Sequence, residues 1–157
     1  MSAFGSYLRT VMDLGRDEAR QDGSDTVEAQ HLLLAITAGP DEVPRQVLAA
    51  AGLDHQTVMD ALDREFEHSL AAAGASAAAF NLPRSSTSLK RPHLGASARL
   101  AVERGFTGQK DPQPADLLLG ILRAQAGTVP RALDLAGVDQ DDLAQRTLLA
   151  RAAAQDR

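Results

Sequence analysis

Two stretches of this 157-residue chain share one pattern, and this duplication constrains the fold more than any other feature. Residues 27–58 align with residues 112–143 at a constant shift of 85 positions, without a gap. In both, a triple-Leu block (Leu32–Leu34 and Leu117–Leu119) is followed at the same distance by Ala-Gly-Leu-Asp or Ala-Gly-Val-Asp. A small helical unit of this kind has a marginal core when alone, so duplicated units pack together. The sequence predicts two related halves with a shared core.

Apolar residues follow helical spacing nearly throughout, and no stretch shows the strict alternation of a strand. Stop and cap residues then divide each half into four helices. In the first half, the expected helices run from Phe4 to before Gly23, through Leu32–Ile36 to Gly39, from Pro44 to Gly52, and onward from an Asp54 cap. In the second half, the first expected helix covers 92–104 and the second begins at Pro114. The third lies between a Thr128 cap and Gly137, and the fourth follows an Asp139 cap.

The apolar stripes indicate which helices are central. The triple-Leu helices are apolar around most of their circumference, which predicts a core position for both. The fourth helix carries an apolar stripe at a spacing of four residues: Val58, Leu62, Phe66 and Leu70. The alignment between the first helices of the two halves stays open, because Leu100-Ala101 matches Leu14-Gly15 better when the shift changes by one residue.

The halves are joined by a segment of different composition. Residues 71–88 are dominated by Ala, Ser, Gly and Pro, which is typical of a linker. We therefore expect one domain over 1–157, with repeat one over about 1–70 and repeat two over about 89–155.

Composition excludes several functional classes. The chain has no Cys, so disulfides, thiol nucleophiles and thiolate metal sites are ruled out. It has no apolar run of the roughly 18 residues needed to cross a bilayer, and its start lacks a signal-peptide pattern. A net charge of -5 argues against nucleic acid as a partner. We expect a cytoplasmic protein that binds neither membranes nor nucleic acid.

The sequence also lacks the common catalytic and metal-binding motifs. Its four histidines are widely separated, without metal-ligand spacing, and no G-x-S-x-G elbow accompanies a serine. His31 is interpreted as a helix N-terminal residue that bonds to the local backbone. The chain given contains no phosphate-binding loop, since Gly108-Gln109-Lys110 lacks the required first Gly and hydroxyl. We expect no enzyme activity, no metal and no cofactor.

These residues, in this order, resemble the Clp N-terminal repeat domain of the ClpC and ClpA class of AAA+ unfoldases. The resemblance covers nearly the whole chain and is carried by Phe4-Gly5-Ser6, Asp17-Glu18-Ala19-Arg20, Ala29-Gln30-His31-Leu32 and Ala51-Gly52-Leu53-Asp54. It implies an all-α fold in which two pseudo-symmetric four-helix repeats form one eight-helix domain. It also implies a recognition domain that docks adaptors and substrates. Because the sequence given lacks the phosphate loop, we expect a stand-alone domain without the ATPase modules, unless the chain is a fragment of a longer one.

The resemblance points to two sets of site positions. A Glu in each repeat of the ClpC branch helps bind arginine-phosphorylated substrates, and the matching positions here are Gln30 and Ala115. Neither residue offers the carboxylate that a guanidinium needs, so phosphoarginine recognition is not expected to transfer. An apolar groove that binds cyclic peptides in the family is expected between Phe4 and Leu89.

Two functions follow as hypotheses. The first is an adaptor or regulator of a Clp protease system that binds a ClpC-type unfoldase, its substrates or its adaptors. The alternative is a resistance-type protein that binds and sequesters small cyclic peptides or other apolar ligands.

Overall fold

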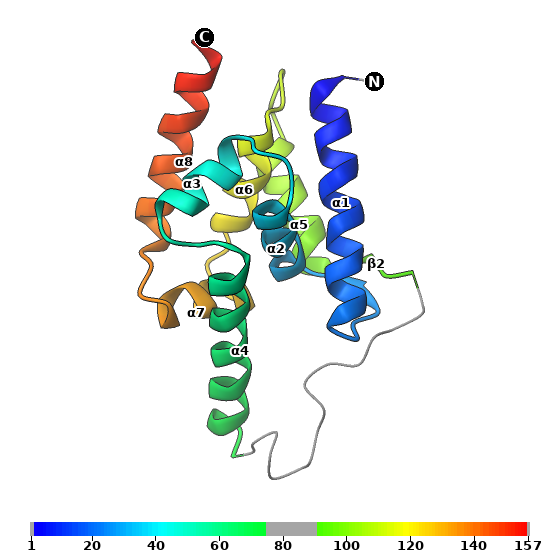
Figure 1. Cartoon of the computed structure of the whole chain (residues 1–157), viewed down its shortest axis with the longest axis vertical. Coiled ribbons are helices and arrows are strands. Elements are labelled where there is room, and N and C mark those ends of the chain that lie inside the picture. The colour runs from blue at the N-terminus through cyan, green and yellow to red at the C-terminus, as the bar shows by residue number, and fades with distance from the viewer. Residues whose placement is uncertain (1, 75–90, 157) are drawn as a thin grey trace.

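The computed structural model describes residues 2–74 and 91–156, in which eight helices and one pair of very short strands are present (Figure 1). The elements are α1 (Ala3–Gln21), β1 (Thr26–Val27), α2 (Ala29–Ala38), α3 (Val43–Ala50), α4 (His55–Ala72), β2 (His93–Leu94), α5 (Ala96–Phe106), α6 (Pro114–Leu122), α7 (Thr128–Leu135) and α8 (Gln140–Gln155). The predicted all-α class is confirmed. Most of the predicted linker lies outside the described residues, and so does Leu89. The division into repeats stays a prediction.

Most predicted helix boundaries are confirmed by their caps. The Asp54 side chain accepts a hydrogen bond from the Thr57 backbone N–H at 2.8 Å, and Asp139 accepts one from Asp142 at 3.0 Å. These side chains satisfy backbone donors that the first turn of a helix leaves without an internal partner. Pro114 is the first residue of α6, as predicted.

Two predicted helix starts are wrong. The cap of α7 is Gly127, not Thr128, because the chain turns into this helix at a φ of 120° that favours glycine. Helix α5 begins at Ala96 rather than at Pro92, because the residues between them take part in a strand pair.

The expectation of no strand is corrected by one short parallel pair between β1 and β2. The His93 N–H donates to the Asp25 carbonyl at 3.1 Å, and the Gly95 N–H donates to the Val27 carbonyl at 2.8 Å. Two residues per strand are too few to produce an alternating pattern in the sequence. The pair joins the segment before α2 to the segment before α5, so it connects the two halves.

The core lies around α2 and α6, which occupy the middle of the bundle (Figure 1). Leu32 and Leu117 have no exposed surface, and the rest of both triple-Leu blocks is also buried. The prediction that these helices are central is confirmed. Full burial of a leucine side chain contributes roughly 1.5–3 kcal/mol of hydrophobic free energy.

The outer helices pack across the two halves. Helix α3 lies against α8, and α4 lies against α7, so each half contributes a short helix to the other (Figure 1). The buried face of α4 contains Val58, Ala61 and Glu65, whereas Phe66 of the predicted stripe is 38% exposed. The stripe therefore describes only the start of this helix. Glu65 takes the core position because Arg131 of α7 pairs with it, at 2.9 Å from Nε to Oε1.

Glycine sets the distance between α5 and α6. A Cβ atom on Gly120 would collide with the backbone carbonyl of Ala101, so the two backbones touch at this crossing. The buried residues Gly15 and Ala19 of α1 match Ala101 and Gly105 of α5 at a shift of 86, not 85. The structure thus favours the one-residue change of register that the sequence left open.

Candidate binding site

A pocket of about 370 Å³ lies between the start of α2, helix α5 and the connection from α6 to α7. We call it the Gln30 pocket, because one of the predicted site residues lines it. Its lining residues are Glu28, Ala29, Gln30, Ser97, Leu100, Ala101, Arg104, Ile121, Ala124, Ala126, Gly127, Thr128, Val129, Pro130 and Arg131. Both halves contribute to it.

One wall of the Gln30 pocket is a polar junction between the halves. The Glu28 carboxylate accepts hydrogen bonds from the Ser97 hydroxyl at 2.7 Å, the Ser97 backbone N–H at 3.3 Å and the Thr26 hydroxyl at 2.5 Å. The Ser97 hydroxyl oxygen also accepts from the Ala29 N–H at 2.8 Å. Burial pushes the pKa of Glu28 upward, but the bonds from Thr26 and Ser97 outweigh it and hold the pKa below its usual range. Glu28 is therefore ionised at neutral pH.

The rim of the pocket carries two arginines. Arg131 donates through Nε to Glu65, which leaves its two Nη groups without a bond to any described residue. The Arg104 side chain is exposed and forms no ion pair within residues 2–74 and 91–156. Gln30 lies on the same rim and is half-buried. The rim thus offers more hydrogen-bond donors than acceptors.

The floor of the pocket is apolar. Ala101, Ile121 and Val129 are buried beneath it, and the Leu100 side chain is 45% exposed at its edge.

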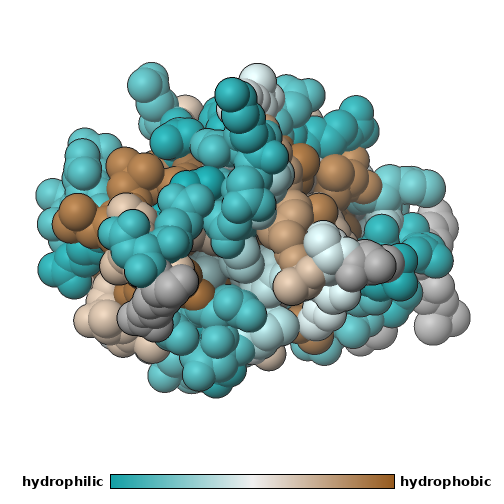
Figure 2. Space-filling model, turned by 90° about the horizontal axis from the view of Figure 1, so that it is seen from above, coloured by the Kyte–Doolittle hydropathy of each residue, from teal (hydrophilic) through white to brown (hydrophobic). Residues whose placement is uncertain are grey.

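Other large apolar side chains are exposed outside the pocket, among them Leu149 at 70%. Hydrophobic areas alternate with hydrophilic ones when the molecule is seen from above (Figure 2).

The second position that the resemblance indicates has no matching site. Ala115 lies in the first turn of α6 and is buried, with 1% of its surface exposed. The next residue, Asp116, is also 1% exposed, and its carboxylate pairs with Arg151 through contacts of 2.7 and 3.0 Å. Gln30 and Ala115 are thus equivalent in sequence but differ in access to solvent.

His31 bonds to the local backbone, as predicted. Its Nδ1 accepts from the Glu28 backbone N–H at 2.9 Å, and its Nε2–H donates to Asp22 at 3.0 Å. The ring is 2% exposed, so it has a structural role at the start of α2.

Phe4 contacts an aromatic residue that the sequence analysis did not single out. Its ring meets Phe106 edge to face, with centroids 5.3 Å apart and planes at 84°. This contact joins the start of α1 to the end of α5. The scarcity of aromatic residues, with only four Phe in the chain, was the one available signal. Leu89 lies outside the described residues, so the groove between Phe4 and Leu89 stays a prediction.

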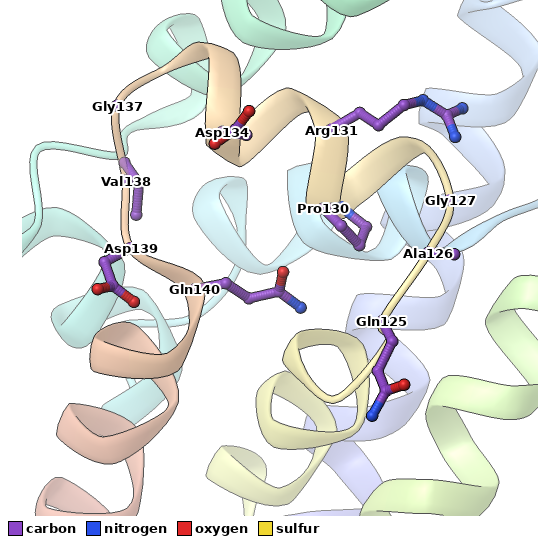
Figure 3. Close-up of a pocket in the computed structure, with 10 residues that line it drawn as sticks. All are labelled: Gln125, Ala126, Gly127, Pro130, Arg131, Asp134, Gly137, Val138, Asp139 and Gln140. Atoms are coloured by element: carbon purple, nitrogen blue, oxygen red, sulfur yellow. The ribbon is translucent and has the colours of Figure 1, made fainter.

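A second, open depression of about 830 Å³ lies on the other side of the first turn of α7 (Figure 3). It shares Ala126, Gly127, Pro130 and Arg131 with the Gln30 pocket. Figure 3 shows the Arg131 side chain extending away from the Gln140 end of this depression. The Gln140 amide is already used, because its Nε2 donates to two backbone carbonyls at 2.6 Å each.

Two other kinds of feature are absent from the described residues. Within the described ranges, no group of three or more His, Asp or Glu side chains could hold a metal ion. None of the helices placed there has the length and apolar character that a membrane span requires.

Comparisons with known proteins agree with the fold. The structure is similar to the crystal structure of the N-terminal domain of the caseinolytic protease associated chaperone ClpD from Arabidopsis thaliana, with a TM-score of 0.62 and 17% sequence identity. The match covers 94% of this chain and 96% of that chain. No curated protein matches the chain. A model of the Clp repeat (R) N-terminal domain matches residues 3–91, more than half of the sequence. The chain therefore belongs to the Clp repeat (R) N-terminal domain family.

Proposed function

We propose that this chain is a non-catalytic recognition domain that binds substrates, adaptors or peptide segments for a ClpC-type unfoldase and so regulates a Clp protease system. The observation that carries the proposal is the Clp repeat fold, matched over 94% of the chain, with the Gln30 pocket built from both halves. Domains of this family take part in protein interaction, so the proposed function is binding rather than catalysis.

The pocket has the properties that peptide recognition needs. It combines an apolar floor with a few polar groups that can orient a ligand. Its walls come from packed helices and from the bonds between Glu28 and Ser97, so the pocket is preformed and little ordering is required on binding.

Binding to a purified ClpC-type unfoldase, measured by biolayer interferometry, tests the proposal. The same protein is then added to the unfoldase with its protease and a fluorescent substrate, and the degradation rate is followed. We expect saturable binding and a changed rate. The Leu100→Asp variant, which places a charge at the pocket edge, should weaken binding. Leu149→Asp makes the same change at an exposed position outside the pocket and should not.

Absence of both binding and any rate change at micromolar concentrations would contradict the proposal. If a cyclic peptide instead raised the melting temperature while the unfoldase did not bind, sequestration of apolar ligands would replace it.

A further inference from the structure

We propose that the Gln30 pocket selects peptide segments that carry a carboxylate beside an apolar side chain, and that it discriminates against segments that carry arginine or lysine there. The inference rests on the proposed function, since it assumes that this pocket binds peptides. It names the chemical class of the ligand.

The charged groups available to a ligand at the rim are hydrogen-bond donors. Arg104 has an unpaired guanidinium among the described residues, and Arg131 retains two Nη groups beyond its bond to Glu65. Guanidinium groups bind carboxylates through paired, charge-assisted hydrogen bonds. The rim therefore matches a carboxylate on the ligand.

Glu28, the one acidic residue that lines the pocket, does not offset the positive charge of the rim. The Glu28 carboxylate already accepts three hydrogen bonds, two of them from Ser97. It also lies against Gly95, where a Cβ atom would collide with it, so it is held toward the start of α5. The Glu28 carboxylate therefore has little acceptor capacity left for a cationic ligand, whereas an anionic ligand would leave its bonds intact.

The two halves differ at Arg104, the rim residue with no ion-pair partner among the described residues. At the shift of 86 that fits the buried faces of α1 and α5, Arg104 corresponds to Glu18, whose carboxylate is bound by His55 at 2.6 Å. At the shift of 85, Arg131 corresponds to Gln46. The pair of arginines is thus a property of the second half, and both line the pocket together with Gln30 of the first half. Glu65 partly neutralises Arg131, whereas Arg104 has no carboxylate partner among the described residues.

The apolar floor adds the second part of the preference. Ala101, Ile121 and Val129 lie beneath the rim, and Leu100 extends its edge. A volume of about 370 Å³ admits one or two side chains of a peptide rather than a folded surface. The expected ligand is a short segment in which Asp, Glu or a C-terminal carboxylate adjoins Leu, Val or a similar residue.

Fluorescence polarisation with matched labelled octapeptides tests the inference. The peptides share one Leu-containing sequence and differ at a single neighbouring position, which is Asp, Asn, Arg or phosphoserine. We expect the Asp peptide to bind roughly three- to tenfold more tightly than the Asn peptide, and the Arg peptide to bind most weakly. The advantage of Asp should shrink as salt is raised from low to a few tenths molar.

Variants assign the effect to the pocket. Arg104→Gln should remove most of the preference for Asp over Asn, and Gln30→Glu should reduce it by placing a carboxylate at the same rim. Arg9→Gln removes another exposed arginine, from α1 and outside the pocket lining, and should leave the preference unchanged. Circular dichroism shows whether each variant is folded.

Equal binding of the Asp and Asn peptides, tighter binding of the Arg peptide, or a preference that survives Arg104→Gln would overturn the inference. Strong binding of phosphoserine with no advantage of Asp over Asn would overturn it as well. If the unfoldase still binds in a Leu100-sensitive manner, the proposed function stands without this selectivity. If Leu100→Asp affects neither the unfoldase nor any peptide, the proposed function fails at this pocket.

Discussion

Replacing Arg151 with Met removes the partner of a carboxylate that is almost completely buried. Asp116 is 1% exposed, and Arg151 holds both of its oxygens, at 2.7 Å from Nε and 3.0 Å from Nη2. After the substitution, the only bond left to the carboxylate in the described structure is from the Gln113 backbone N–H, at 2.8 Å. Met keeps the apolar stem, so the loss is mainly electrostatic.

The expected cost is that of leaving one buried charge unpaired. Loss of one member of a buried ion pair destabilises a protein by about 3–5 kcal/mol. The lower end applies here, because the Arg151 side chain is 16% exposed and water can replace part of it. We therefore expect a loss of about 3 kcal/mol in the free energy of unfolding, which lowers Tm by roughly 6–12 °C for a domain of this length.

A second ion pair on the same helix provides the control. Arg146 pairs with Asp142 at 2.9 Å, but both side chains are more than half exposed, at 54% and 56%. Arg146→Met should cost only about 0.3–0.5 kcal/mol. Urea unfolding followed by far-UV circular dichroism measures both variants, and Asp116→Asn combined with Arg151→Met should recover part of the loss. Equal effects of the two Arg→Met variants would refute the reasoning.

Three further substitutions test other contacts. Glu28→Gln removes a carboxylate whose pKa is lowered in the folded state, so its stabilising effect is present above the unfolded pKa and is lost as pH falls through the folded one. The difference in urea midpoint between wild type and Glu28→Gln should accordingly be largest near pH 7 and shrink below about pH 4; a constant difference would contradict this. Gly120→Ala should destabilise by about 3 kcal/mol in urea unfolding, because its Cβ overlaps the Ala101 carbonyl and α5 must shift away from α6; a change under about 0.5 kcal/mol would show that the crossing is looser. Phe4→Ala should cost about 1 kcal/mol by removing the edge-to-face contact with Phe106, seen as a Tm lower by roughly 2–4 °C; an unchanged Tm would argue that the contact does not form.

Features that depend on neighbouring residues in the chain could be predicted from the sequence. Asp54 and Asp139 cap helices because the cap bond is made within three residues. The triple-Leu blocks are buried because an all-round apolar helix has no other stable position. The start of α7 was misplaced by one residue, since Thr is the better cap by type while Gly127 supplies the positive φ of the turn.

The candidate site could be predicted only in part, because it is assembled from distant segments. The resemblance singled out Gln30, but nothing near it in the sequence indicates that Arg104 and Arg131 line the same pocket. The Glu28–Ser97 junction spans 69 positions of the chain and leaves no local pattern. Glu65 was hidden for the same reason, since a carboxylate on a buried face is stable only because of a partner on another helix.

The two polar residues that follow Gln30 and Ala115 explain how the halves differ without a change of fold. His31 and Asp116 occupy equivalent buried positions, and each accepts a hydrogen bond from the backbone three residues earlier. A buried polar group there needs a complementary partner, and each half supplies one from a different place.

His31 donates to Asp22, at the end of α1, whereas Asp116 accepts from Arg151, near the end of α8. The helix start is therefore maintained by either residue type, provided that the matching partner is present. Gln30 is free of this requirement because it faces the pocket rather than the core. Under the proposed function, we expect its replacement to change what the pocket binds at little cost in stability, so that ligand preference could differ between members of this fold while the core stays the same.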